Sequence, residues 1–194
     1  MIDFAEFGRP PIVVAIAGPN GAGKSTFFES HVAASGLRFV NADLLANEHG
    51  IDAYASASLA DSIRRALVER GESFAFETVF SDPVGDKVAF LEETARRGYT
   101  VVLCYVGIAG PDQSIDRVAM RALQGGHVVP IEKLRSRFSR TLDNLRAAIV
   151  YLPHVLIYDN SDLALPFRHV AVFDHGEASL LNEPLPEWLR PLVP

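Results

Sequence analysis

The sequence predicts one α/β domain, residues 1–194, whose mostly parallel sheet is covered by helices on both faces. Short apolar segments typical of buried strands alternate with longer segments of helical spacing. A glycine-rich turn at residues 18–25 joins the first apolar segment to the first helical one. The 194 residues suffice for one such domain with a sizeable core and leave no room for a second of similar size.

The individual elements follow from local patterns. Strand composition is found at residues 12–17, 38–41, 73–77, 99–108, 155–159 and 169–173, and helical spacing at 25–35, 53–70, 84–97, 111–123 and 130–152. Gly71 and Gly98 directly follow two of these helices, where glycine is favoured. Pro130 suits the first turn of the last helix. The proline-punctuated tail, about residues 175–194, is expected to wrap the surface.

The amino-acid composition indicates which partners and which cellular compartment to expect. Hydrophobic residues make up 48% of the chain and the net charge is -6, so bulk electrostatics favour no nucleic-acid partner. The single cysteine, Cys104, lies in an apolar run and rules out an internal disulfide framework. No apolar run approaches a membrane span, and the N-terminus lacks the basic segment of a signal peptide. We expect a soluble cytoplasmic protein with no membrane partner.

The glycine-rich turn fits the phosphate-binding pattern G-x-x-x-x-G-K-[ST]. The residues predicted to bind the nucleotide there are Gly18, Pro19, Asn20, Gly21, Ala22, Gly23, Lys24, Ser25 and Thr26. Glycines bring bare N–H groups close to an anion, Lys24 reaches the outer phosphates, and the Ser25 hydroxyl ligates Mg²⁺. The absence of an N-K-x-D segment argues against a guanine nucleotide.

Polar residues after the second and third strands are the candidates for acceptor chemistry, because ligands of such sheets bind beyond the carboxyl ends of the strands. Asp43 is a candidate general base, although an aspartate there also suits a helix N-cap. Glu77 is predicted to bind substrate hydroxyls or to lie near Mg²⁺ through water; the alternatives are an exposed loop acid or a structural hydrogen bond. Thr78 and Ser81 are further candidates for this substrate pocket.

Arginines after the fourth strand are the candidates for binding phosphates. Arg117 and Arg121 share a helix face and are predicted to grip phosphates, unless they form a solvated face with acids such as Asp116. Arg121 is favoured as the catalytic one, and Arg137 is preferred among the later Arg135, Arg137 and Arg140.

A small mobile lid is expected over about residues 111–140, with a break at 124–130. Within it, His127 is predicted to contact phosphate or to cap the neighbouring helix. Asn160, after the fifth strand, is predicted to contact the nucleotide base or to form an Asx-type turn.

The runs GPNGAGKST, NAD, FAFETVFS, GYTVVLCYVG, RVAMRALQGGHVVP, RTLDNL and YDNSD together resemble the zeta-toxin family of P-loop kinases, over about residues 12–162. The resemblance is greatest to its short bacterial branch, often described as predicted ABC-type ATPases. It implies an adenylate-kinase-like three-layer fold with strand order 2-3-1-4-5. It also implies transfer of the ATP γ-phosphate, with Mg²⁺, to a hydroxyl of a UDP-N-acetylamino sugar such as UDP-N-acetylglucosamine, and an antitoxin partner.

The resemblance assigns roles to positions that the residues already favour. Lys24 and Ser25 match the phosphate-loop lysine and the Mg²⁺ ligand, Asp43 the general base, Glu77 a substrate-binding glutamate and Arg121 a lid arginine. The chain departs from the family at His127, where well-studied toxins carry a second lid arginine. It also has less material to hold a UDP moiety, so another small metabolite stays open as acceptor. The alternative functions are an ATP-binding regulatory or interaction module and a simple ATPase.

Overall fold

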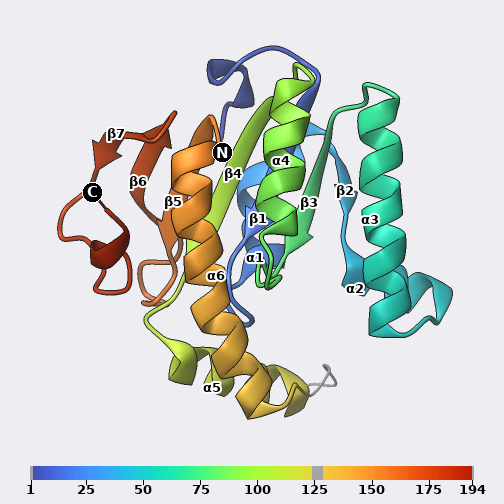
Figure 1. Cartoon of the computed structure of the whole chain (residues 1–194). Coiled ribbons are helices and arrows are strands. Elements are labelled where there is room, and N and C mark those ends of the chain that lie inside the picture. Colours follow the sequence, from blue (N-terminus) through green and yellow to red (C-terminus); the bar gives the residue numbers. More distant parts are fainter. Residues whose placement is uncertain (1, 124–128, 194) are drawn as a thin grey trace.

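The structure, a computed structural model, describes residues 2–123 and 129–193 and has a seven-stranded sheet of order β2-β3-β1-β4-β5-β6-β7 (Figure 1). The strands are β1 (Ile12–Ala17), β2 (Arg38–Val40), β3 (Phe74–Thr78), β4 (Thr100–Gly107), β5 (His154–Asp159), β6 (Arg168–Asp174) and β7 (Glu177–Leu181). The first five strands run parallel, whereas β6 pairs antiparallel with β5, and β7 with β6. The α/β fold class and the predicted order of the first five strands are confirmed.

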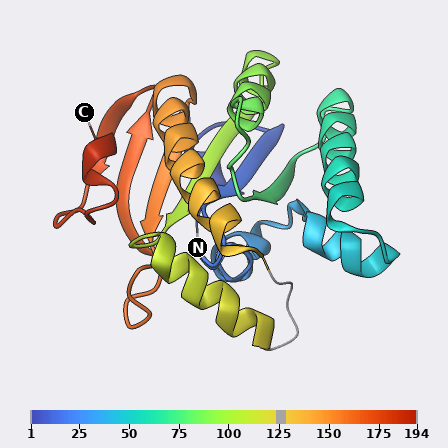
Figure 2. The same ribbon diagram turned by 60° about the horizontal axis from the view of Figure 1, so that its bottom comes forward.

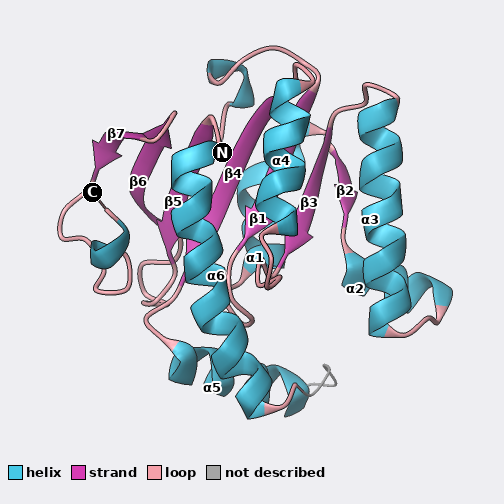
Figure 3. Cartoon of the chain, in the orientation of Figure 1, coloured by secondary structure: helices cyan, strands magenta, loops and turns pink. Residues whose placement is uncertain are grey.

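Helices cover both faces of the sheet and form the outer layers (Figures 1 and 3). They are α1 (Lys24–Phe27), α2 (Ala42–His49), α3 (Ala53–Glu69), α4 (Asp86–Arg96), α5 (Pro111–Leu123) and α6 (Ile131–Tyr151). Helices α3, α4 and α6 pack on the face that carries Val13 and Ala15. The residues of α1 and of the turns after it pack on the opposite face, against Val14 and Ile16. This is the predicted three-layer arrangement.

The central strands form because their sequences are apolar on both faces. Every residue of β1 is buried, and so is every residue of β4 after Thr100. A strand covered on both faces needs such an uninterrupted apolar run, which is the pattern of parallel sheets in α/β proteins. Cys104 is one of these buried residues, as its surroundings predict, and burial raises the pKa of its thiol.

Helix ends agree with the sequence at two positions and differ at two others. Gly71 and Gly98 take the left-handed conformation just after α3 and α4, as predicted. Pro130 is the N-cap of α6 with extended ψ, so it precedes the first turn instead of lying in it. The helix predicted over 25–35 ends as α-helix at Phe27 and continues as a π-helical turn, Phe28–Val32, and a 3-10 turn.

The C-terminal tail does more than wrap the surface. It supplies the edge strand β7 and then returns, so that the Trp188 ring packs directly against Gly107 at the end of β4. The Trp188 indole donates a 2.9 Å hydrogen bond to Asp159 at the end of β5. Gly107 leaves the space that this ring fills, because a Cβ there would collide with the indole. The prediction of a surface tail was therefore wrong for Trp188, which is buried.

Helices α2 and α5 and the start of α6 lie beyond the end of the sheet where the parallel strands finish (Figure 2). Helix α2 was not among the predicted helices, because its eight residues bury no side chain fully and carry little apolar signal. Across the described residues, no helix is both long enough and apolar enough to span a membrane.

Candidate functional site

The predicted phosphate loop follows β1 and adopts the tight geometry that its glycines allow. Gly18, Gly21 and Gly23 all have positive φ, at 145°, 74° and 89°. At Gly18 a Cβ would collide with the carbonyl oxygen of Val106 in β4. Only glycine lets the chain leave β1 so close to the neighbouring strand, so the loop can turn its N–H groups outward toward an anion.

Lys24 is buried at the start of α1, held by its own loop and by the third strand. Its Nζ donates a 3.1 Å hydrogen bond to the Pro19 carbonyl and lies 3.7 Å from Oε1 of Glu77. Burial lowers the pKa of Lys24, while the charges of Glu77 and Asp43 favour its protonated form and that of Arg121 opposes it. Glu77, Asp43 and Arg121 therefore act electrostatically on one lysine, although they come from three different segments.

Glu77 joins the phosphate loop to the start of α2. Its Oε2 accepts hydrogen bonds from Ser25 Oγ at 2.8 Å and from Asn41 Nδ2 at 2.9 Å. The side chain is only 16% exposed, so the alternative of an exposed loop acid is wrong. Ser25 is exposed at the head of α1, and exposed Thr26 follows it. The carboxylate and the Ser25 hydroxyl place two hard oxygen ligands side by side.

Asp43 lies in the first turn of α2, but it is not the N-cap. Asn41 caps the helix, because its Oδ1 accepts hydrogen bonds from the N–H groups of Asp43 and Leu44 at 2.8 and 3.3 Å. The alternative that Asp43 caps the helix is therefore wrong, and Asp43 lines a cavity of about 200 Å³ beyond the ends of β2 and β3. Glu77 and Thr78 line the same cavity.

Arg117 is bound to backbone carbonyls and not to acids. Its guanidinium donates to Asn160 at 2.8 Å, to Ser161 at 3.4 Å and to Gly21 at 3.4 Å. The side-chain amide of Asn160, which is buried, donates a 2.8 Å hydrogen bond to the Ala22 carbonyl. Arg117 and Asn160 thus brace the phosphate loop from outside, so the alternative of a solvated face is wrong for Arg117. Their contacts with a nucleotide stay predictions.

The other arginines differ in their partners. Arg121 is exposed on α5, and Arg135 is exposed and pairs with Asp112 at 2.8 Å. Arg140 donates a 2.8 Å hydrogen bond to the Ser81 carbonyl, and Ser81 does not line the cavity that Asp43, Glu77 and Thr78 share. Arg137 is half-buried, and burial together with the charge of Arg140 lowers its pKa. Within residues 2–123 and 129–193, Arg137 has no hydrogen bond or ion pair.

His127 lies outside the described residues, so its predicted roles are not addressed by the structure. The expected lid, residues 111–140, is anchored at its first helix, because Ser114 Oγ donates a 2.7 Å hydrogen bond to the Asn20 carbonyl of the phosphate loop. Closure of this lid stays a prediction.

Several residues that hold the loops of the site in place were not predicted from the sequence. Helix α6 holds the loop after β3 through Thr141, which donates to the Val79 carbonyl at 3.0 Å, and Asn144, which donates to the Phe80 carbonyl at 3.0 Å. Phe80 is buried with φ of 61°, a strained conformation for a bulky residue. Asn41 was also missed, and its position just before a short helix was the available signal.

The parallel sheet and the glycine-rich loop after β1 define the P-loop nucleotide-binding fold. The profile of the zeta toxin family matches residues 52–169, which is more than half of the chain. The chain therefore belongs to the zeta toxin family, as its sequence motifs predicted. The match begins after the phosphate loop, so the family assignment does not depend on that loop.

Known proteins of three kinds resemble the chain. The hemin import ATP-binding protein HmuV of Rhodopseudomonas palustris (strain BisB18) is 30% identical over 162 residues, which cover 81% of this chain and 54% of that protein. The crystal structure of AvrRxo1-ORF1:-ORF2 with ATP matches at a TM-score of 0.69 and 19% identity, covering 91% of this chain and 62% of the matched chain. A structure of the PezAT chromosomal toxin–antitoxin system of Streptococcus pneumoniae matches at 0.58 and 16% identity, covering 80% and 72%.

These matches differ in length from the chain described here. The chain spans about half the length of the hemin import protein and less than two thirds of the matched AvrRxo1 chain. At 16–19% identity, the structural matches establish the fold.

Proposed function

We propose that this protein is an ATP-dependent kinase that transfers the γ-phosphoryl group of ATP to a hydroxyl of a small molecule. The observation that carries the proposal is the cavity lined by Asp43. It lies next to the phosphate loop, because Glu77 both lines the cavity and contacts Lys24 and Ser25. A donor site and an acceptor site thus share one carboxylate.

ATP binds on the loop Gly18–Ser25 in this proposal. The loop N–H groups and Lys24 hold the phosphates, and Ser25 and Glu77, whose oxygens lie 2.8 Å apart, would hold Mg²⁺. When bound, the metal ion neutralises charge on the phosphates. The bound ATP of the AvrRxo1-ORF1:-ORF2 structure supports the choice of nucleotide on the same fold.

The transfer needs a base and positive charge. As the acceptor oxygen forms its bond to the γ-phosphorus, the bond from that phosphorus to the bridging oxygen breaks and ADP leaves. Asp43 takes the proton of the acceptor hydroxyl. Arg121 and Arg137 compensate charge on the transferred group, Arg121 because it already acts on Lys24 and Arg137 because it is half-buried without a partner in the described chain.

A UDP-N-acetylamino sugar or a similar metabolite is the proposed acceptor, on the strength of family membership. Glu77, Thr78 and Ser81 are the proposed contacts of the acceptor, together with Asp43. An antitoxin is the proposed protein partner, since PezAT is by its title a toxin–antitoxin system on a similar fold.

The experiment that tests the proposal is ³¹P NMR of purified protein with ATP and Mg²⁺, with and without a panel of UDP-amino sugars. A new phosphomonoester resonance with one sugar supports the kinase, and it must be absent with Lys24→Ala. ADP and inorganic phosphate at a rate that no acceptor changes would favour a simple ATPase. Tight ATP binding without any turnover would favour a regulatory module.

A further inference from the structure

The acceptor cavity is lined by charges of both signs. Asp43 and Glu77 line it together with Arg64 of α3 and Lys87 of α4. The pKa of Lys24 responds to Glu77, Arg121 and Asp43, while that of Arg64 responds to Asp61 and Arg65. Asp43 and Glu77 therefore act on Lys24 of the donor site, whereas Arg64 belongs to a cluster around Asp61.

Arg64 is almost completely buried, which is unusual for an arginine. It is 4% exposed, and its guanidinium lies over the Phe76 ring at 4.9 Å. Its Nη2 donates a 2.8 Å hydrogen bond to Asp61, but its buried Nε has no hydrogen-bond partner in the described structure. A buried donor without a partner is costly, because it has lost its hydrogen bonds to water, and a ligand that contacts it would explain why it is retained.

The charges around Asp61 also indicate that Arg64 can bind a further partner. Asp61 is the carboxylate shared by Arg64, Arg65 and Lys87, at 2.8, 3.0 and 3.2 Å. One carboxylate cannot neutralise three cations, so the cluster keeps an excess of positive charge. Of the three cations, Arg64 and Lys87 line the acceptor cavity.

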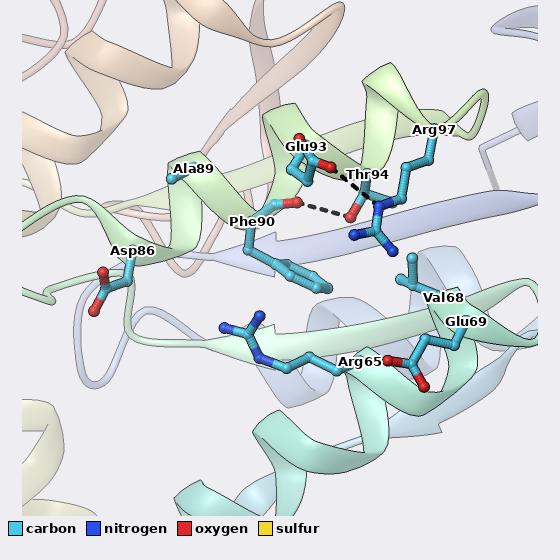
Figure 4. Close-up of a pocket in the computed structure, with 9 residues that line it drawn as sticks. All are labelled: Arg65, Val68, Glu69, Asp86, Ala89, Phe90, Glu93, Thr94 and Arg97. Atoms are coloured by element: carbon cyan, nitrogen blue, oxygen red, sulfur yellow. Dashed lines mark hydrogen bonds and ion pairs between the residues drawn. The ribbon is translucent and has the colours of Figure 1, made fainter.

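Arg65 points elsewhere, which makes it a matched control. Figure 4 shows Arg65 beside Phe90 in a separate hollow between α3 and α4. Its guanidinium lies 5.9 Å from the Phe90 ring centre, and its side chain is 63% exposed. Arg65 thus shares Asp61 with Arg64 but does not line the acceptor cavity.

We propose that the acceptor carries an anionic group, a carboxylate or a phosphoryl group, that Arg64 and Lys87 bind where α3 and α4 line the cavity. This inference rests on the proposed kinase function and narrows its substrate class. The acceptor hydroxyl lies at Asp43, and the anion lies at Arg64 and Lys87. The cavity volume of about 200 Å³ favours a compact metabolite, or the charged part of a larger one whose remainder extends outside.

The binding test needs no turnover. The protein is saturated with a non-hydrolysable ATP analogue and Mg²⁺, so that the phosphate loop is filled, and is titrated with inorganic phosphate or with acetate. The Nε–H resonance of Arg64, assigned by its loss in Arg64→Lys, is followed by NMR. We expect a saturable shift with at least one anion, weakened about tenfold or more in Lys87→Gln and unchanged in Arg65→Gln. The stronger anion identifies the group as phosphoryl or carboxylate.

A second experiment measures phosphoryl transfer, so that this inference and the kinase proposal are tested separately. Glucose, glucuronate and glucose 6-phosphate differ only at one carbon and are compared as acceptors. Faster transfer to a charged member, lost in Lys87→Gln, supports the inference. A saturable anion shift without transfer to any acceptor also supports it, while removing support from the kinase.

Two outcomes would overturn the inference. One is the absence of a saturable shift with either anion, or a shift of equal affinity in Lys87→Gln. The other is transfer to glucose as fast as to its charged relatives, which leaves the kinase intact but assigns Arg64 to packing on Phe76.

Discussion

Oγ of Ser25 donates a 2.8 Å hydrogen bond to Oε2 of Glu77, although the two residues are 52 positions apart in the chain. The contact exists because β1 and β3 are parallel neighbours, so that Ile16 pairs with Glu77 and the phosphate loop begins where β3 ends. It connects the residue proposed to ligate Mg²⁺ with the wall of the acceptor cavity. A substitution of Glu77 should therefore affect both the binding of Mg²⁺ and the binding of the acceptor.

Replacing Glu77 with Gln should raise the Mg²⁺ concentration that gives half-maximal turnover, by about tenfold or more. The amide keeps the size of the side chain but lacks the negative charge that would attract Mg²⁺. The measurement is initial rate against free Mg²⁺ at saturating ATP, with Glu72→Gln as a control at an exposed acid before the same strand. An unchanged Mg²⁺ dependence would assign Glu77 to the acceptor alone.

Replacing Asp43 with Asn should lower kcat by about 10²–10⁴-fold and leave the KM for ATP unchanged, because general-base catalysis acts on the acceptor hydroxyl. Steady-state kinetics with the acceptor at saturation measures both constants. Glu48→Gln, at an exposed acid on the same helix, is the matched control. Turnover that survives Asp43→Asn would exclude Asp43 as the base.

Replacing Arg137 with Ala should lower kcat by about 10²-fold, as expected for the loss of a charged group that stabilises the transferred phosphoryl group. Arg135→Ala should have little effect, because Arg135 forms an exposed ion pair with Asp112. Rates of the two variants, with thermal unfolding to compare their stability, provide the comparison. Equal effects of the two substitutions would contradict the role given to Arg137.

The Asp61 cluster should make stability depend on acid pH. Burial disfavours the Asp61 carboxylate, but hydrogen bonds from Arg65 and Arg64 and the charge of Lys87 outweigh this and hold its pKa well below its usual value. A lowered folded-state pKa stabilises the protein above the unfolded pKa of about 3.9, and this contribution is lost as pH falls below it. The free energy of unfolding in urea should thus favour wild type over Asp61→Asn at about pH 6, with a smaller difference at about pH 3. An equal difference in the free energy of unfolding at both pH values would show that the ionised Asp61 carboxylate contributes nothing to stability.

Local patterns predicted the parts of the fold and site that depend on neighbouring residues. The apolar run of β1 and the glycines after it indicate a buried strand and a phosphate loop without any knowledge of the rest of the chain. Asp43 and Glu77 could be singled out because parallel strands end at one edge of a sheet. That they act on the same lysine depends on strand order, which the family resemblance supplied.

Long-range packing determined what the sequence could not predict. Nothing near Arg64 in the sequence indicates that its guanidinium is buried over Phe76, since that contact requires α3 to lie on β3. Likewise, Trp188 reaches Asp159 only because the tail folds back over the end of β4. Asn144 acts through hydrogen bonds to the distant loop after β3, so its amide carries no local signal.

The central claim is that the γ-phosphoryl group passes to an acceptor hydroxyl and not to water. The most direct test incubates the protein with Mg²⁺ and ATP carrying ¹⁸O in the γ-phosphoryl group, in a small-molecule extract of bacterial cells, followed by mass spectrometry. We expect a hydroxylated, anionic metabolite to gain a labelled phosphoryl group with wild type and not with Lys24→Ala. Label found only in inorganic phosphate would contradict it and leave an ATPase.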